Sequence, residues 1–232
     1  MIPDLRATVL GVCTGRVGDL GTARRPMPSA FVKAPVDGRV PLGRLGLPGD
    51  EHVYEHHGGP DMALLVYPVE HYAAWRRELG LELPDLAAFG ENLTTQGFTE
   101  HDVHVGDVFS IGTALVQACQ PRTPCYKLAA RFGIKDMAVR VQATGRTGYL
   151  LRVLTEGEIG AGDQLVLRDR EDHGLTIAEA GRIVNVARAD VAGARRVLAV
   201  ASLGSAVRAT LAARVDAPTA DELDRPRLFG DD

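Results

Sequence analysis

Gln120-Pro121-Arg122-Thr123-Pro124-Cys125-Tyr126-Lys127 is the most informative segment of the chain. It lies between an apolar pattern over 114–119, which predicts a strand, and a helical pattern over 125–132. Thr123 suits the cap of that helix, and Pro124 suits its first position. We therefore expect a strand that leads through a rigid turn into a short helix, with a cysteine in the first helical turn.

The surroundings of Cys125 favour an ionised sulfur. A helix N-terminus carries partial positive charge, and Arg122 and Lys127 add a cation on either side. A thiolate on a rigid turn can bind a transition metal or act as a nucleophile. The alternative is a small buried hydrophobe. That alternative is our expectation for Cys13 and Cys119, because both end apolar strand patterns without nearby charge.

A second candidate segment is His57-Gly58-Gly59-Pro60-Asp61. Its paired glycines let the backbone approach a ligand closely and present N–H groups to anionic oxygens. His57 is a further hydrogen-bond donor to an oxygen-rich ligand. A plain turn that leads into the apolar run over 62–67 explains the same residues equally well.

Four polar residues outside these segments are also candidates. Asn92 can donate and accept at once, and so read the edge of a heterocycle, although an Asx turn is the simpler interpretation. Lys33 stands in a strand-like context over 31–36, as a functional cation or a snorkelling edge residue. Arg140 and Arg146 flank a glycine turn and are suited to a phosphate, but solvated surface charge is the default for both.

Composition excludes several classes of protein. The chain has 232 residues, 45% hydrophobic and 24% charged, which is ordinary for a globular protein. A net charge of −4 disfavours a nucleic-acid partner. The sequence has neither an apolar run of about 18 residues nor a secretory signal pattern, so we expect no membrane association. Three cysteines do not make a disulfide framework, and the expected location is the cytoplasm.

The first 171 residues are patterned as a barrel. Glycine and proline are spread along the chain, which predicts many short elements joined by tight turns. A helix is expected over 69–79, with Pro68 at its first position and Gly80 after its end. Gly106-Asp107 and Gly162-Asp163 are similar turns that fit barrel corners. Strands are expected over 7–13, 62–67, 103–111, 114–119, 149–154 and 164–167, and a further helix over 135–143.

After residue 171 the strand signal disappears. Thr176 and Glu179 form a capping-box pattern, and Asp190 and Ser202 are candidate caps of two more helices. From Asp216 onwards, prolines and mixed charge indicate a frayed tail. The chain lacks a nucleotide phosphate loop, a dinucleotide-binding glycine motif, zinc-ligand spacing and the cysteines of an iron–sulfur cluster.

The candidate motifs together resemble the MOSC domain family, named for the C-terminal domain of molybdenum-cofactor sulfurase. The chain is similar in particular to the bacterial 6-N-hydroxylaminopurine resistance subfamily, whose members add a small C-terminal three-helix domain. The resemblance covers nearly the whole chain. It implies a mainly β fold with short helices: a MOSC-type mixed β-barrel over 1–171, then a three-helix domain and tail over 172–232. It rests on Lys33, His57-Gly58-Gly59-Pro60-Asp61, Gly90-Glu91-Asn92-Leu93, Gly106-Asp107 and the cysteine segment, in that order.

The resemblance also implies a molybdenum cofactor of the molybdopterin type, with the thiolate of Cys125 as a ligand of molybdenum. Pyridoxal phosphate is not expected. Arg122 and Lys127 would meet the phosphate end of the cofactor, and Asn92 would read the pterin edge. The implied cofactor-binding residues are His57, Gly58, Gly59, Asn92, Arg122 and Lys127. The implied catalytic residues are Cys125, Lys33 and His57, with Lys33 as a proton donor or positive charge beside the metal.

The implied activity is the reduction of N-hydroxylated bases or related N-oxygenated compounds. Electrons would come from a separate flavin- or haem-type protein, and a homodimer is left open. Two alternatives remain. The protein could carry or deliver the cofactor without turnover, or Cys125 and His57 could form a nucleophile and base in a metal-free hydrolase or transferase.

Overall fold

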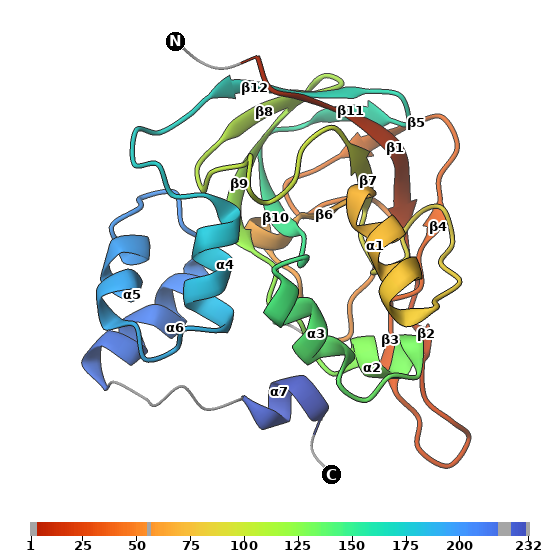
Figure 1. Ribbon diagram of the computed structural model, residues 1–232. Helices are drawn as coiled ribbons and strands as arrows, with labels where there is room; N and C mark the ends of the chain where they lie inside the picture. The colour runs from red at the N-terminus through yellow and green to blue at the C-terminus, as the bar shows by residue number, and fades with distance from the viewer. Residues whose placement is uncertain (1–3, 55–56, 218–223, 231–232) are drawn as a thin grey trace.

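A closed β-barrel forms the centre of the molecule (Figure 1). The computed structural model describes residues 4–54, 57–217 and 224–230. Within this part of the chain, seven strands follow the order β12-β8-β9-β10-β6-β7-β1, and β1 pairs back with β12. Closure leaves the barrel without an unpaired edge. The barrel strands are β1 (Arg6–Thr14), β6 (Leu64–Pro68), β7 (Leu93–Gln96), β8 (Val108–Ile111), β9 (Ala114–Pro121), β10 (Tyr149–Thr155) and β12 (Gln164–Asp169).

Short strands decorate the barrel. They are β2 (Gly18–Asp19) paired with β3 (Pro28–Ser29), β5 (Arg39–Leu42) paired with β11 (Gly157–Gly160), and β4 (Ala34–Pro35) on the end of β1. The expected strand over 31–36 is therefore wrong for most of its length, and Lys33 precedes β4. Only Ala34 and Pro35 pair with β1 as a ladder, and Val36 N then donates once to Val12 O at 2.9 Å.

The helix expected over 69–79 is confirmed as α1 (Glu70–Leu79). It connects β6 to β7, which lie parallel and so need a crossover connection. Tyr72 and Trp75 are its buried residues, and Gly80 ends it in the left-handed conformation with φ of 62°. Pro68 ends β6 instead of opening the helix.

Two further helices follow β9. The helix expected over 125–132 is α2 (Lys127–Phe132), and the one expected over 135–143 is α3 (Met137–Thr144). Helix α2 begins two residues later than expected, at Lys127, and the N–H of Tyr126 at its cap position donates to the carbonyl of Arg227, 2.8 Å away. Thr123 therefore does not cap the helix, and no side chain does.

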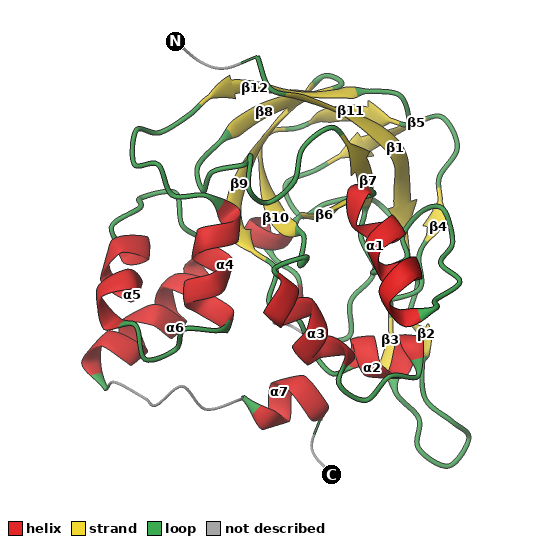
Figure 2. Cartoon of the chain, viewed as in Figure 1, coloured by secondary structure: helices red, strands yellow, loops and turns green. Residues whose placement is uncertain are grey.

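Helices α4 (Ile177–Asn185), α5 (Val191–Leu198) and α6 (Ser205–Asp216) lie together beside the barrel (Figure 2). Thr176 and Asp190 accept hydrogen bonds from Glu179 N and Gly193 N, as their capping patterns predict. Ser202 does not cap α6, where Gly204 stands at the cap position. The buried apolar residues of these helices form one continuous cluster with those of the barrel. The division of the chain at 171/172 stays a prediction.

The expected frayed tail is wrong where the structure describes it. Helix α6 extends to Asp216, and Asp224 caps a further helix, α7 (Arg225–Phe229). Leu228 of α7 is fully buried in a second apolar cluster with residues of α1, α2 and α3. The remaining tail residues, 218–223 and 231–232, lie outside the described ranges. Among the helices described, none combines the length and apolar character needed to cross a membrane.

Candidate functional site

A cavity of about 450 Å³ opens between the barrel and helices α4 and α6. The cysteine segment forms part of its wall. Gly59 is described but does not line this cavity, whereas its neighbour Gly58 does. The cavity thus brings together residues that are far apart in sequence. The predicted site residues that line it are Lys33, His57, Gly58, Asn92, Arg122, Cys125 and Lys127.

The three cysteines differ in the way the sequence predicts. Cys13 and Cys119 are fully buried, which raises the pKa of Cys13 to about 11 and that of Cys119 to about 12. Both therefore stay protonated at neutral pH. Cys125 is a free, half-buried thiol on the cavity wall. It lies two residues before α2, and Arg122 and Lys127 are two sources of positive charge near it.

Arg122 has an unsatisfied guanidinium. Its Nη1 is buried and finds no hydrogen-bond partner in the described residues. The guanidinium carbon stands 5.8 Å from the centre of the Phe31 ring. Burial lowers the pKa of Arg122, while the negative charge of a Cys125 thiolate opposes that shift. An arginine remains charged under these conditions and prefers an anionic partner.

Lys127 is a second cation on this wall, with only 3% of its surface exposed. Its Nζ lies 4.4 Å from the centre of the Tyr54 ring and 3.5 Å from the carbonyl oxygen of Pro28. Burial lowers the pKa of Lys127, and Cys125 again acts in the opposite direction. Within the described part of the chain, neither Lys127 nor Arg122 forms an ion pair with a carboxylate. The thiol therefore interacts electrostatically with two cations that have no carboxylate partner among the described residues.

The polar groups of Lys33 and Asn92 are bonded within the protein through Asp50. Lys33 forms a largely buried ion pair with Asp50. The amide nitrogen of Asn92 donates to Asp50 at 2.8 Å and to the Cys13 carbonyl at 3.2 Å. Its amide oxygen accepts from Leu65 N at 3.0 Å. Asn92 thus makes long-range contacts instead of an Asx turn, and its donors are already engaged.

The glycine segment has specific steric needs. A Cβ on Gly58 would lie 2.5 Å from the imidazole of His52, so a larger residue there would displace this exposed side chain. Gly59 has φ of 110°, which other residues rarely adopt. His57 is exposed at the cavity and its ring stands 5.4 Å from that of Tyr54.

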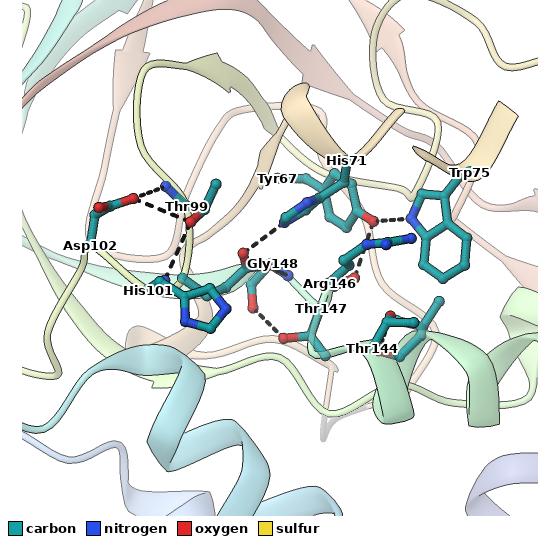
Figure 3. Close-up of polar contacts among 12 residues, drawn as sticks. Tyr67, His71, Trp75, Thr99, His101, Asp102, Thr144, Arg146, Thr147 and Gly148 are labelled. Atoms are coloured by element: carbon teal, nitrogen blue, oxygen red, sulfur yellow. Dashed lines mark hydrogen bonds and ion pairs between the residues drawn. The ribbon is translucent and has the colours of Figure 1, made fainter. Parts of the chain in front are cut away.

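Arg140 and Arg146 do not line the cavity. Arg146 donates to both carboxylate oxygens of Glu78, at 2.8 and 2.9 Å. Its carbonyl accepts from the hydroxyl of Tyr67, which itself accepts from Trp75 Nε1 at 2.7 Å (Figure 3). Arg140 pairs with Asp136 on the surface. Both arginines are thus structural, and neither is placed to meet a phosphate in the cavity.

The sequence did not reveal several residues of the cavity wall. Asp50 looks like part of a glycine-rich loop, and Arg227 falls in the expected tail. Gln120 and Asn185 are 3% and 2% exposed, and Gln120 Oε1 and Asn185 Oδ1 find no partner in the described chain. Gln120 stands within the cysteine segment, and a polar residue at this point of an apolar strand was the one available sign that it belongs to the cavity wall.

The barrel and the cavity that contains Cys125 indicate a class of protein, and comparison with known proteins identifies that class. The chain belongs to the MOSC domain family, whose model matches residues 53–166. It is 42% identical to protein YiiM of Escherichia coli over 206 residues, 88% of this chain and 91% of that protein. The crystal structure of Escherichia coli YiiM superposes with a TM-score of 0.75, at 36% identity, over 97% of this chain and all of that one.

Another relative carries a functional name. It is a Gibberella moniliformis protein called a reductase, 35% identical over 179 residues. Those residues are 76% of this chain and 32% of that larger protein. These relatives support the family and subfamily expected from the cysteine and glycine motifs.

Proposed function

We propose that this protein binds a molybdopterin-type molybdenum cofactor through Cys125 and reduces N-hydroxylated bases or related N-oxygenated compounds. The observation that carries the proposal is a free thiol at a cavity wall, near two cations that pair with no carboxylate in the part of the chain that the structure describes. Membership of the MOSC family and a relative called a reductase support it.

The residues present fit this cofactor. In the described ranges, no group of three or more His, Cys, Asp or Glu side chains could hold a bare metal ion. A metal that already has dithiolene ligands needs only one more thiolate, and a soft sulfur anion suits molybdenum. The unpartnered Nη1 of Arg122 and the ammonium of Lys127 suit the phosphate of the pterin.

The chain's own residues then have separate tasks. The cofactor, when bound, would supply the two electrons that the reduction requires. Overall, a hydroxylamine takes up two electrons and two protons and yields an amine and water. Lys33, which lines the cavity, would deliver a proton to the departing oxygen, and its ion pair with Asp50 would hold the ammonium for this role. His57 and the backbone of Gly58 border the same space. The electrons would come from a separate flavin- or haem-type protein.

The test is Cys125→Ser, with Cys119→Ala as a matched control. Protein is produced in a host that makes the cofactor, and molybdenum is measured per chain. We expect Cys125→Ser to lose both the metal and the reduction of a hydroxylated purine, because a serine hydroxyl is a poor ligand for a soft metal site. The control should keep its metal, since Cys119 faces the core. Full molybdenum content in Cys125→Ser would exclude ligation by this residue.

The same preparation separates the two other candidate functions. A carrier would retain the cofactor through Cys125 but would not convert hydroxylamine to amine when given a reductant. A metal-free nucleophile would be labelled by electrophilic substrates and would keep its activity after the cofactor is removed.

A further inference from the structure

The C-terminal helix α7 holds the cysteine segment on both sides of Cys125. The carbonyl of Arg227 accepts from the N–H of Tyr126 at 2.8 Å. The guanidinium of the same residue donates to the carbonyl of Pro124. One residue of α7 thus fixes the backbone immediately before and immediately after the cysteine. Figure 1 shows α7 beside α2 and α3, at the same end of the molecule.

Arg227 is itself held firmly. Its Nη2 donates to Gln142 Oε1 of α3 at 2.8 Å, and its Nε lies 3.3 Å from Asp224 Oδ2. The neighbouring Leu228 is fully buried in the apolar cluster of α1, α2 and α3. Because its anchors lie on α3 and within α7, Arg227 ties the cysteine segment to an independent part of the structure.

Arg227 also adds charge to the cavity, which it lines together with Arg122 and Lys127. Burial lowers the pKa of Arg227, while Asp224 and Cys125 act in the opposite direction. An arginine stays protonated in spite of this shift. The guanidinium is therefore a third positive group on the side of the cavity where the thiol lies.

We propose that Arg227 is a positioning residue for Cys125, and that α7 is a strap that keeps the thiol directed at the cavity. The inference rests on the proposed function only where it concerns the metal. The position of the thiol can be measured on cofactor-free protein, so a failure of the metal assignment and a failure of the strap give different results.

The experiment uses the full chain and measures the rate at which N-ethylmaleimide alkylates each cysteine, located by mass spectrometry. Cys13 and Cys119 are fully buried and serve as internal controls. In Arg227→Ala we expect Cys125 to react about tenfold faster, because local opening of the segment is no longer opposed. The rates are compared at their high-pH plateau, where the thiol is fully ionised and loss of the Arg227 charge no longer alters the thiolate fraction. Arg227→Lys keeps one donor for the Pro124 carbonyl, so its Cys125 alkylation rate should fall between those of the wild type and Arg227→Ala. Arg225→Ala is the matched control, since Arg225 stacks on Phe229 within α7.

Molybdenum content of protein made in a cofactor-producing host is the second measurement. Arg227→Ala should retain less than the wild-type chain, and Arg227→Lys should restore part of the loss. Equal Cys125 rates in Arg227→Ala and the wild type overturn the proposal. The proposal is also overturned if the alkylation rates of Cys13, Cys119 and Cys125 rise together in both Arg227 variants, because that result would show a general loosening of the fold. If the alkylation rate rises selectively at Cys125 and even the wild-type protein contains no molybdenum, the result supports the positioning role of Arg227 and rejects the proposed cofactor.

Discussion

Two parts of the cavity wall differ in whether their polar groups have partners within the protein. The bonded wall consists of Lys33, Asp50 and Asn92, which bond to one another and to backbone groups. The unbonded wall consists of Gln120, Arg122 and Asn185, each with a buried polar atom that has no partner among the described residues. Buried polar atoms are normally paired, so unpaired ones at a cavity suggest that a ligand supplies the partner. The bonded wall is a preformed frame, and the unbonded wall is where a ligand would be recognised.

Breaking the bonded wall should have the largest effect on stability. Asp50 accepts from Gly15 N at 2.8 Å, from Asn92 and from Lys33. In Asp50→Ala, the ammonium of Lys33 is left unpaired with 8% of its side chain exposed. We expect the free energy of unfolding to fall by about 3–5 kcal/mol, measured by urea denaturation.

The control for this prediction is Asp136→Ala. Asp136 forms an exposed ion pair with Arg140, both with 47% of their side chains exposed. Such pairs contribute less than about 1 kcal/mol. Equal losses in Asp50→Ala and Asp136→Ala would show that the bonded wall is not a frame.

The two walls also differ in how far the sequence predicted them. Arg122 was identified because it stands three residues from Cys125, within one short segment. Asp50 was missed because its partners lie 35 and 42 positions away, and local patterns do not register such pairs. Arg227 is 103 positions from Pro124, and its segment has the proline and mixed charge of a tail. That segment nevertheless carries local helix signals, with Asp224 as the cap and Pro226 in the first turn, and the burial of Leu228 adds a tertiary contact that the sequence does not show.

Elements with strong periodicity or capping chemistry were predicted well. Helix α1 follows from the spacing of Tyr72, Trp75 and Leu79, and α4 follows from the Thr176 cap. The predicted start of α2 was two residues too early, because Thr123 does not cap the helix, whose cap position is Tyr126. The predicted strand around Lys33 was wrong for most of its length, because only Ala34 and Pro35 pair with β1.

A smaller effect should come from the joint between the barrel and α6. The carboxylate of Asp61 accepts from the N–H and the hydroxyl of Ser205, both at 2.8 Å, and pairs with Arg152 at 2.9 Å. Burial raises the pKa of Asp61, but the Ser205 hydrogen bonds and Arg152 outweigh it and hold the pKa below 3.8. The charged form is therefore favoured by folding.

Asp61→Asn should cost about 1–2 kcal/mol at neutral pH, because hydrogen bonds to a charged group are lost. A depressed folded pKa contributes stability above the unfolded value of 3.8, and this is lost as the pH falls through the folded value. The difference between Asp61→Asn and the wild type should be full at neutral pH and should narrow as the pH falls below 3.8. Thermal denaturation across this range checks the sign. Asp4→Asn, which alters an exposed pair, should show no such trend.

The smallest effect on stability is expected for substitutions in the unbonded wall. A variant there gives the clearest contrast with the bonded wall. The amide nitrogen of Asn185 donates to the carbonyl of Arg122 at 3.2 Å, which fixes the orientation of the amide, and Oδ1 has no partner in the described chain. Asn185→Ala removes one hydrogen bond and should cost about 1 kcal/mol in the cofactor-free protein. Cofactor retention should fall more clearly, about tenfold in affinity, if Oδ1 accepts from the ligand. A stability loss as large as that of Asp50→Ala, with retention unchanged, would mean that this side chain belongs to the frame and that the two walls are alike.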